Sequence, residues 1–169
     1  MELLTKVDIK PSDWKIVYQN KIVMLGSCFA DNIGKKFAEH YFQTTINPYG
    51  TLYNPASIVS AIQEDSFHIL QYQGLWHSML HHGSFSHMDR LVLMERCGQS
   101  RVNLSTSLQD ADTVIVTFGT AWVYEMDGKV VANCHKLPAN RFTRRCLTVN
   151  EIVDIWKPIV QNTSEKRWI

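Results

Sequence analysis

The first third of the chain passes from one hydrophobic pattern to another. Residues 21–25 form a short apolar run of β-prone side chains, which predicts a buried strand. Apolar side chains then recur every four residues from Phe29 to Phe37, with charged residues off that face. This spacing predicts an amphipathic helix that runs to about Phe42. The residues Gly26-Ser27-Cys28 therefore mark a junction between a strand and a helix.

A second strand is predicted over residues 113–118, a nearly continuous β-branched run that ends at Gly119-Thr120. Such a run is typical of a strand buried on both faces, as in a parallel sheet. Strands separated by helices predict an α/β fold with a mainly parallel sheet. Because parallel strands have their carboxyl ends at one edge, where ligands bind, Ser27 and Thr120 are both expected there.

Other elements are marked by turn and cap signals. A helix is predicted over residues 56–63, with Asn54 as its cap, and a hairpin turn at Asp127-Gly128. A last helix is expected to start near Thr148 with a capping box. The stretch from Ser66 to Gly98 has weak periodicity and permits no assignment.

Length and composition favour one soluble globular domain over residues 1–169. Apolar residues make up 45% and charged residues 20%, and the net charge is +1. This balance gives no case for a nucleic-acid or membrane partner, and the arginines at 141, 144 and 145 are interpreted as a solvated loop.

Localisation is predicted to be cytoplasmic. The start Met1–Lys6 lacks a basic segment followed by an apolar run, and no stretch approaches the ~20 apolar residues of a membrane helix. The four cysteines are widely spaced, which favours reduced thiols over disulfides or a zinc site.

Ser27 has two interpretations. Its hydroxyl can cap the following helix, or it can act as an exposed nucleophile beside backbone N–H groups that hold an oxyanion. Cys28 is a competing nucleophile in the same turn. A separate group of histidines raises a metal-dependent hydrolase as an alternative; it consists of His77, His81, His82 and His87. His77 and His81 would share one face of a helix, but Gly83 argues against a continuous helix there.

Five motifs in order resemble the GSCFA family from about Gly26 to Leu147. They are Gly26-Ser27-Cys28-Phe29-Ala30, then residues 47–55 (NPYGTLYNP), His81-His82 with Phe85-Ser86, residues 119–124 (GTAWVY) and residues 131–136 (VANCHK). The family is similar to the SGNH hydrolases, which are three-layer α/β/α esterases and lipases. The resemblance implies that Ser27 attacks an acyl ester, with an acylated carbohydrate suggested by analogy, and that no cofactor is required.

The resemblance also implies a set of site residues. The backbone N–H groups of Ser27 and Gly50 would be oxyanion donors. The side-chain donor that SGNH enzymes place after a later strand is absent from Gly119-Thr120-Ala121, so Thr120 or Asn133 would have to replace it. Asn47, His81 and His82 are expected to line the pocket.

The catalytic base is the main departure from the family pattern. SGNH enzymes carry an Asp and a His in a final block, and this chain stops at residues 165–169 without one. The expectation is an N-terminal portion of a longer domain, with an incomplete fold and an uncovered sheet edge that favours self-association. His135 is the best internal candidate for the base. The alternative is a catalytically silent binding or truncated domain.

Overall fold

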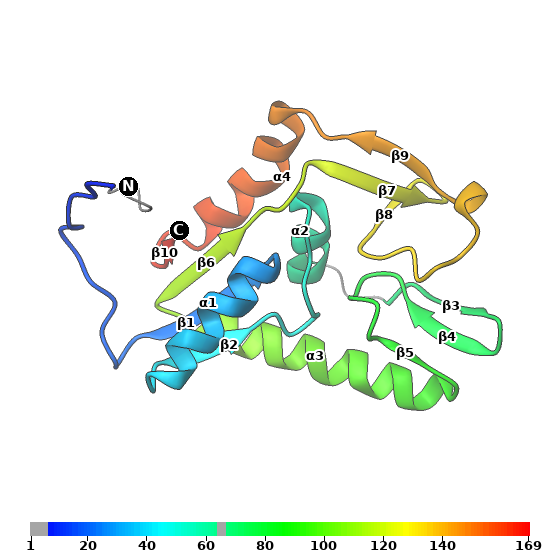
Figure 1. Ribbon diagram of the computed structural model, residues 1–169, viewed down its shortest axis with the longest axis horizontal. Coiled ribbons are helices and arrows are strands. Elements are labelled where there is room, and N and C mark those ends of the chain that lie inside the picture. The colour runs from blue at the N-terminus through cyan, green and yellow to red at the C-terminus, as the bar shows by residue number, and fades with distance from the viewer. Residues whose placement is uncertain (1–6, 64–66) are drawn as a thin grey trace, which may run out of the picture.

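Four parallel strands form the central sheet in the order β10-β6-β1-β2 (Figure 1). The computed structural model describes residues 7–63 and 67–169, so Met1–Lys6, on which the expectation of no leader rests, lies outside the described residues. The strands are β1 (Lys21–Gly26), β2 (Gln43–Ile46), β6 (Thr113–Thr117) and β10 (Arg167–Trp168). Both strands predicted from the sequence are confirmed, the second ending one residue earlier.

Helices cover both faces of this sheet. They are α1 (Cys28–Glu39), α2 (Pro55–Gln63), α3 (Arg90–Asp110) and α4 (Val149–Asn162). Successive strand residues point to opposite faces, so Ile22 and Met24 pack with Ala30 of α1, in front of the sheet in Figure 1. Val23 and Leu25 pack on the other face in a core built with α2, α3 and α4. None of the helices in the described ranges is long and apolar enough to span a membrane.

Two small antiparallel sheets lie on the side to which the parallel strands point (Figure 1). One contains β3 (Ile69–Tyr72), β4 (Leu75–Ser78) and β5 (Ser86–His87); the other contains β7 (Trp122–Met126), β8 (Lys129–Val131) and β9 (Thr143–Cys146). The hairpin turn at Asp127-Gly128 is confirmed, because both residues have positive φ. The short 3-10 helix Ala139–Arg141 leads into β9.

The arginine-rich segment differs from its prediction as a loop. Arg144 and Arg145 lie on β9, paired opposite β7. Arg145 forms ion pairs with Glu125 and Glu151, at 2.8 and 2.6 Å. These cross-strand and strand-to-helix contacts stabilise a strand that a basic stretch alone does not predict.

Two helices differ from the sequence prediction: α1 ends earlier than expected, and α3 was not predicted. α1 ends at Glu39 rather than near Phe42, because Tyr41 takes a positive φ of 63° and the Phe42 N–H donates back to the Phe37 carbonyl. The long α3 begins within the unassigned stretch Ser66–Gly98, is capped by the Asp89 carboxylate and continues to Asp110. Only four of its residues are buried, which explains its weak hydrophobic period.

The remaining caps are confirmed. The Asn54 side chain accepts the Ser57 N–H at 2.8 Å at the start of α2. Thr148 and Glu151 form the predicted capping box of α4, which continues through Pro158.

Gly26 ends β1 at a point where no side chain fits. Its φ is +125°, which L residues rarely adopt, and a Cβ there would collide with the Thr117 carbonyl oxygen on β6. The Ser27 N–H then donates to that same carbonyl at 3.2 Å. Glycine therefore allows the chain to turn from β1 into α1 while it stays against β6.

We predict that Gly26→Ala lowers the free energy of unfolding by about 3 kcal/mol, since it combines backbone strain with a steric clash. Gly98→Ala is the matched control, because a Cβ at this helical position meets nothing within 4 Å and alanine favours helix. Urea unfolding of both variants tests this. Equal stability of the two variants would show that the junction has more space than its geometry indicates.

Candidate active site at the carboxyl edge of the parallel sheet

The strand order creates a switch point between β1 and β6. The chain leaves β1 to form β2 on one side and later returns to form β6 on the other. In parallel α/β sheets, ligands bind beyond the carboxyl ends of the strands at such a point. Ser27 directly follows β1, and Gly119 and Thr120 follow β6. The expectation that both strand ends share one edge is confirmed.

Ser27 lies at this switch point and is 7% exposed. Its Oγ lies 2.9 Å from Thr117 Oγ1, across the two strands. The same Oγ accepts the Phe29 N–H at 3.3 Å, so Ser27 does cap α1. Cys28 is exposed, so the two adjacent side chains point in different directions. The serine rather than the cysteine lies between the strands.

A loop over residues 47–53 lies against this junction. Asn47 Oδ1 accepts the Gly26 N–H at 2.8 Å, and the Leu52 N–H donates to the Gly26 carbonyl at 2.9 Å. The Tyr53 carbonyl accepts the N–H groups of Gly119 and Thr120, at 2.8 and 3.0 Å. These bonds join the loop to the ends of both strands, and Gly119 lies close to the Ser27 side chain.

The two backbone groups implied as oxyanion donors already have acceptors. The Ser27 N–H donates to Thr117, and the Gly50 N–H donates to the Asn47 carbonyl at 2.7 Å. Of the proposed replacements for the missing side-chain donor, Thr120 uses its Oγ1 to accept the Trp122 N–H at 3.0 Å. Asn133 lies elsewhere, beside Gly83. Within the described residues, neither Thr120 nor Asn133 forms a side-chain hydrogen bond with Ser27.

His81 is fully buried between two aromatic rings. Its ring stacks on Tyr49 at 4.1 Å and on Phe85 at 4.3 Å between centroids. Its Nδ1 lies 2.7 Å from Ser78 Oγ. Burial lowers the pKa of His81 to about 3, with smaller contributions from His135 and Arg96. His81 is therefore a neutral ring that packs against the 47–53 loop through Tyr49.

His135 belongs to the same buried group and forms no hydrogen bond with Ser27. Its Nε2 donates to the Ser78 carbonyl at 2.7 Å, and its Nδ1 lies 3.2 Å from Ser86 Oγ. His77 Nδ1 contacts that hydroxyl at 2.8 Å. Burial lowers the pKa of His135 to about 4. In the described ranges, no histidine forms a hydrogen bond with Ser27.

The histidines do not assemble into a metal site. His77 lies on β4 rather than on a helix, so it does not share a helical face with His81. His82 packs against Gly50, and its Nδ1 accepts the Ser84 N–H at 3.2 Å. Across the residues that the structure describes, no group of three His, Cys, Asp or Glu side chains could hold a metal ion. The metal-dependent alternative has no ligand set in this arrangement.

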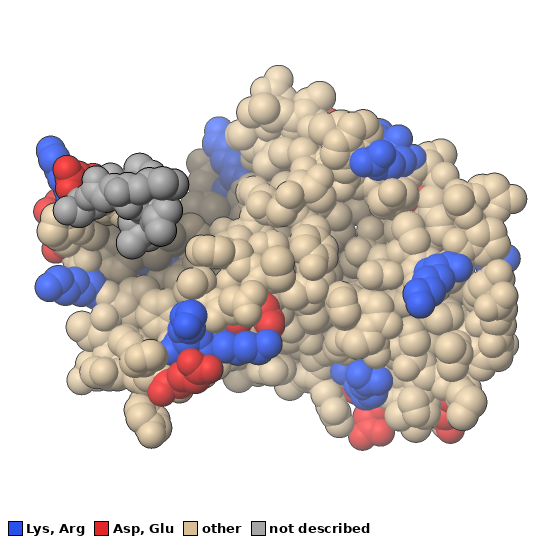
Figure 2. Space-filling view, in the orientation of Figure 1, with Lys and Arg blue, Asp and Glu red and all other residues tan. Residues whose placement is uncertain are grey.

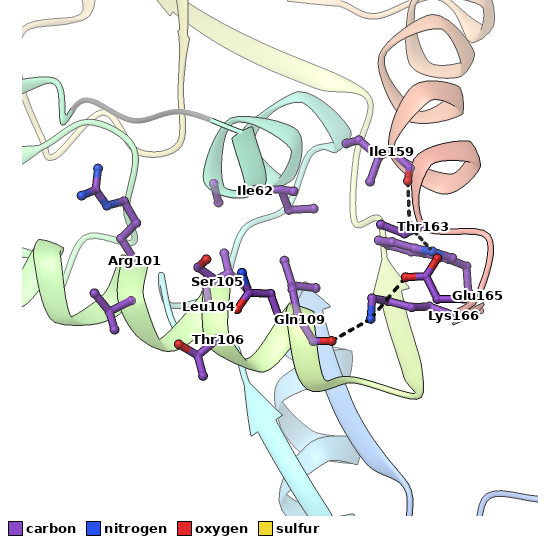
Figure 3. A pocket seen from close by; sticks show the side chains of 14 residues that line it. Ile62, Arg101, Leu104, Ser105, Thr106, Gln109, Ile159, Thr163, Glu165 and Lys166 are labelled. Carbon is purple, nitrogen blue, oxygen red and sulfur yellow. Dashed lines mark hydrogen bonds and ion pairs between the residues drawn. The ribbon is translucent and has the colours of Figure 1, made fainter.

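A cavity of about 750 Å³ lies away from this edge, among α2, α3, α4 and β10 (Figure 3). None of the predicted site residues lines it. Figure 2 shows basic and acidic side chains scattered over the visible face rather than gathered in one patch. Neither the cavity nor the distribution of charge identifies a binding partner for the carboxyl edge of the sheet.

The contact that sequence reasoning missed is Thr117. The sequence pattern Gly119-Thr120 pointed to Thr120, yet the register pairs Gly26 with Thr117. The β-branched run could have indicated it, since Thr117 is the last hydroxyl residue inside the strand. Its selection required the register between β1 and β6.

Together these features define an α/β domain with a candidate site at the switch point of a parallel sheet. The model of the GSCFA family matches residues 21–168. The chain belongs to the GSCFA family. No curated protein and no solved structure matches it at a significant level.

The buried histidines predict an acid-sensitive fold. His81 and His135 have folded pKa values below the unfolded value near 6.5, so the unfolded chain binds more protons. Their contribution to stability is complete above pH 6.5 and falls as the pH drops toward 4 and then 3. His81→Gln should reduce the pH dependence of the unfolding free energy near pH 5 by about 1.4 kcal/mol per pH unit. Urea unfolding from pH 7.5 to 4.5 measures it, and an unchanged slope in the variant would contradict it.

Proposed function

We propose that the protein is an acyl-ester hydrolase of the SGNH type, with Ser27 as its nucleophile. The observation that carries the proposal is the position of Ser27 at the switch point between β1 and β6, at the start of α1. The coverage of the sheet by helices on both faces supports a three-layer α/β/α arrangement of that type. Membership of the GSCFA family agrees with the motif order.

The reaction requires only groups of the protein, the ester and water. Ser27 Oγ bonds to the ester carbonyl carbon, and the alcohol leaves with the proton that the serine gives up. Water then hydrolyses the acyl-enzyme, which releases the acid and restores the Ser27 hydroxyl. No cofactor enters this sequence.

Whether a proton acceptor serves Ser27 decides between this proposal and its rival, a catalytically silent binding domain. Both ring nitrogens of His135 are engaged with Ser78 and Ser86, so we assign His135 to support of the fold rather than to the base. The rival is favoured by the engagement of the Ser27 hydroxyl with Thr117 and Phe29 as a helix cap. A serine without a base is a weak nucleophile.

The substrate class follows from analogy alone. An ester on a small molecule or carbohydrate is the proposed substrate. Self-association is also proposed, through the outer edges of β2 and β10. Sedimentation velocity over a range of concentrations tests it, and a single monomeric species throughout would contradict it.

Labelling with a fluorophosphonate tests the nucleophile. The Ser27 Oγ–phosphorus bond forms, fluoride leaves and the serine proton passes to the buffer. We expect one adduct per chain by intact mass in the wild type and in Cys28→Ser, and none in Ser27→Ala. Only an activated serine reacts at an appreciable rate.

Ser84→Ala is the control, because it removes an exposed hydroxyl whose contacts are with His82. It should label like the wild type. A folded wild-type protein that forms no adduct would support the binding domain instead. Thermal unfolding establishes that Ser27→Ala, which loses a helix cap worth about 1 kcal/mol, is still folded.

A further inference from the structure

Asn47 is fixed at the carboxyl edge by three hydrogen bonds. Its N–H donates to the Met24 carbonyl at 2.9 Å, and its own carbonyl accepts the Gly50 N–H at 2.7 Å. Its side-chain Oδ1 accepts the Gly26 N–H at 2.8 Å. Its φ of 42° lies in the left-handed region, which asparagine tolerates better than most residues. The side chain therefore has one orientation, set by the residue that precedes Ser27.

The other end of this amide has no partner. Asn47 is 8% exposed, and its Nδ2 is buried without a hydrogen bond in the part of the chain that the structure describes. The bond from Gly26 N–H identifies the anchored atom as the oxygen, so the free atom is the nitrogen. A buried donor without an acceptor costs about 1–3 kcal/mol, and folded proteins contain few of them. Three other buried side-chain atoms in the described residues also have no partner, on Ser57, His81 and Trp156. Of the four residues, Asn47 is the one whose side chain bonds to the residue before Ser27.

The neighbouring donors at this edge are already engaged. The Ser27 N–H donates to Thr117, and the Gly50 N–H donates to Asn47 itself. The N–H groups of Gly119 and Thr120 both donate to the Tyr53 carbonyl. Among these groups, the Asn47 amide is the one with a free N–H.

We propose that Asn47 Nδ2 is the side-chain donor that binds the oxyanion formed when Ser27 attacks an acyl ester. This inference rests on the proposed function. It assigns the role to a residue after β2, whereas the resemblance expects it after β6, where Gly119-Thr120-Ala121 has no amide. It also favours Asn47 over Thr120 and Asn133.

The chemistry fits a donor that is held in advance. As Ser27 Oγ bonds to the carbonyl carbon, the π electron pair of the carbonyl moves to its oxygen, which gains a full negative charge. A fixed N–H stabilises that charge without reorganisation during the reaction.

Asn47→Asp tests the assignment, because it keeps the oxygen that accepts the Gly26 N–H and removes the Nδ2 donors. We expect kcat for p-nitrophenyl acetate, and the rate constant for fluorophosphonate labelling, to fall about 10²-fold or more. KM should stay within about twofold, since the donor acts on the charge that develops in the transition state. The residual rate should fall further as the pH rises, because only a protonated carboxyl can donate.

Asn103→Asp is the matched control, with the same change of charge on the exposed side of α3, where its Oδ1 still accepts from Ser107. It should react like the wild type. A cooperatively folded Asn47→Asp that labels at the wild-type rate would overturn the inference and leave the proposed function intact. A wild-type protein that neither labels nor hydrolyses the ester would overturn the proposed function and this inference with it.

Discussion

The close contact between β1 and β6 at Gly26 sets the geometry of the whole carboxyl edge. A side chain at this position would occupy the space of the Thr117 carbonyl. Without one, the two strands remain paired up to their ends, and the next residue, Ser27, bonds to Thr117 through both its N–H and its hydroxyl. The direction of α1 follows from the same turn. The absence of one methyl group thus determines where the candidate nucleophile lies.

The 47–53 loop connects this edge to the rest of the molecule. At one end Asn47 bonds to Gly26, and at the other Tyr53 accepts two N–H groups from the end of β6. In between, Tyr49 stacks on the buried His81. His81 therefore contacts the 47–53 loop through ring packing. Neutral buried rings suit this role, because charging them would require desolvated cations.

Ser27 caps α1, and the proposed function would place a second physical demand on the same side chain. As a cap it must accept an N–H from the first turn of α1, and as a nucleophile it must present an electron pair to a substrate. Its engagement with Thr117 favours the first demand in this conformation. A nucleophile that is ordered in advance needs less conformational change during attack than a mobile one.

The sequence alone determined the local elements whose causes are local. A short apolar run predicted β1 and a β-branched run predicted β6. Asn54 and Thr148 predicted caps, and Asp127-Gly128 predicted a hairpin, because each signal acts within a few residues. The motif order also identified the family. Long-range packing decided the rest. The helix α3 has too few buried side chains to show a clear period, and β9 is held by pairing with β7.

The same division holds for the site. The sequence selected Ser27 from its place between a strand and a helix, but it could not select Thr117, because that contact depends on the register of two strands 90 residues apart. It also grouped His135 with Ser27, and the fold separates them by burying the histidine against Ser78 and Ser86. The motif resemblance placed Asn47 among the expected pocket residues, but the state of its amide depends on the tertiary structure. Its oxygen is bound across two strands while its nitrogen is left without an acceptor, and no pattern along one chain segment contains that information.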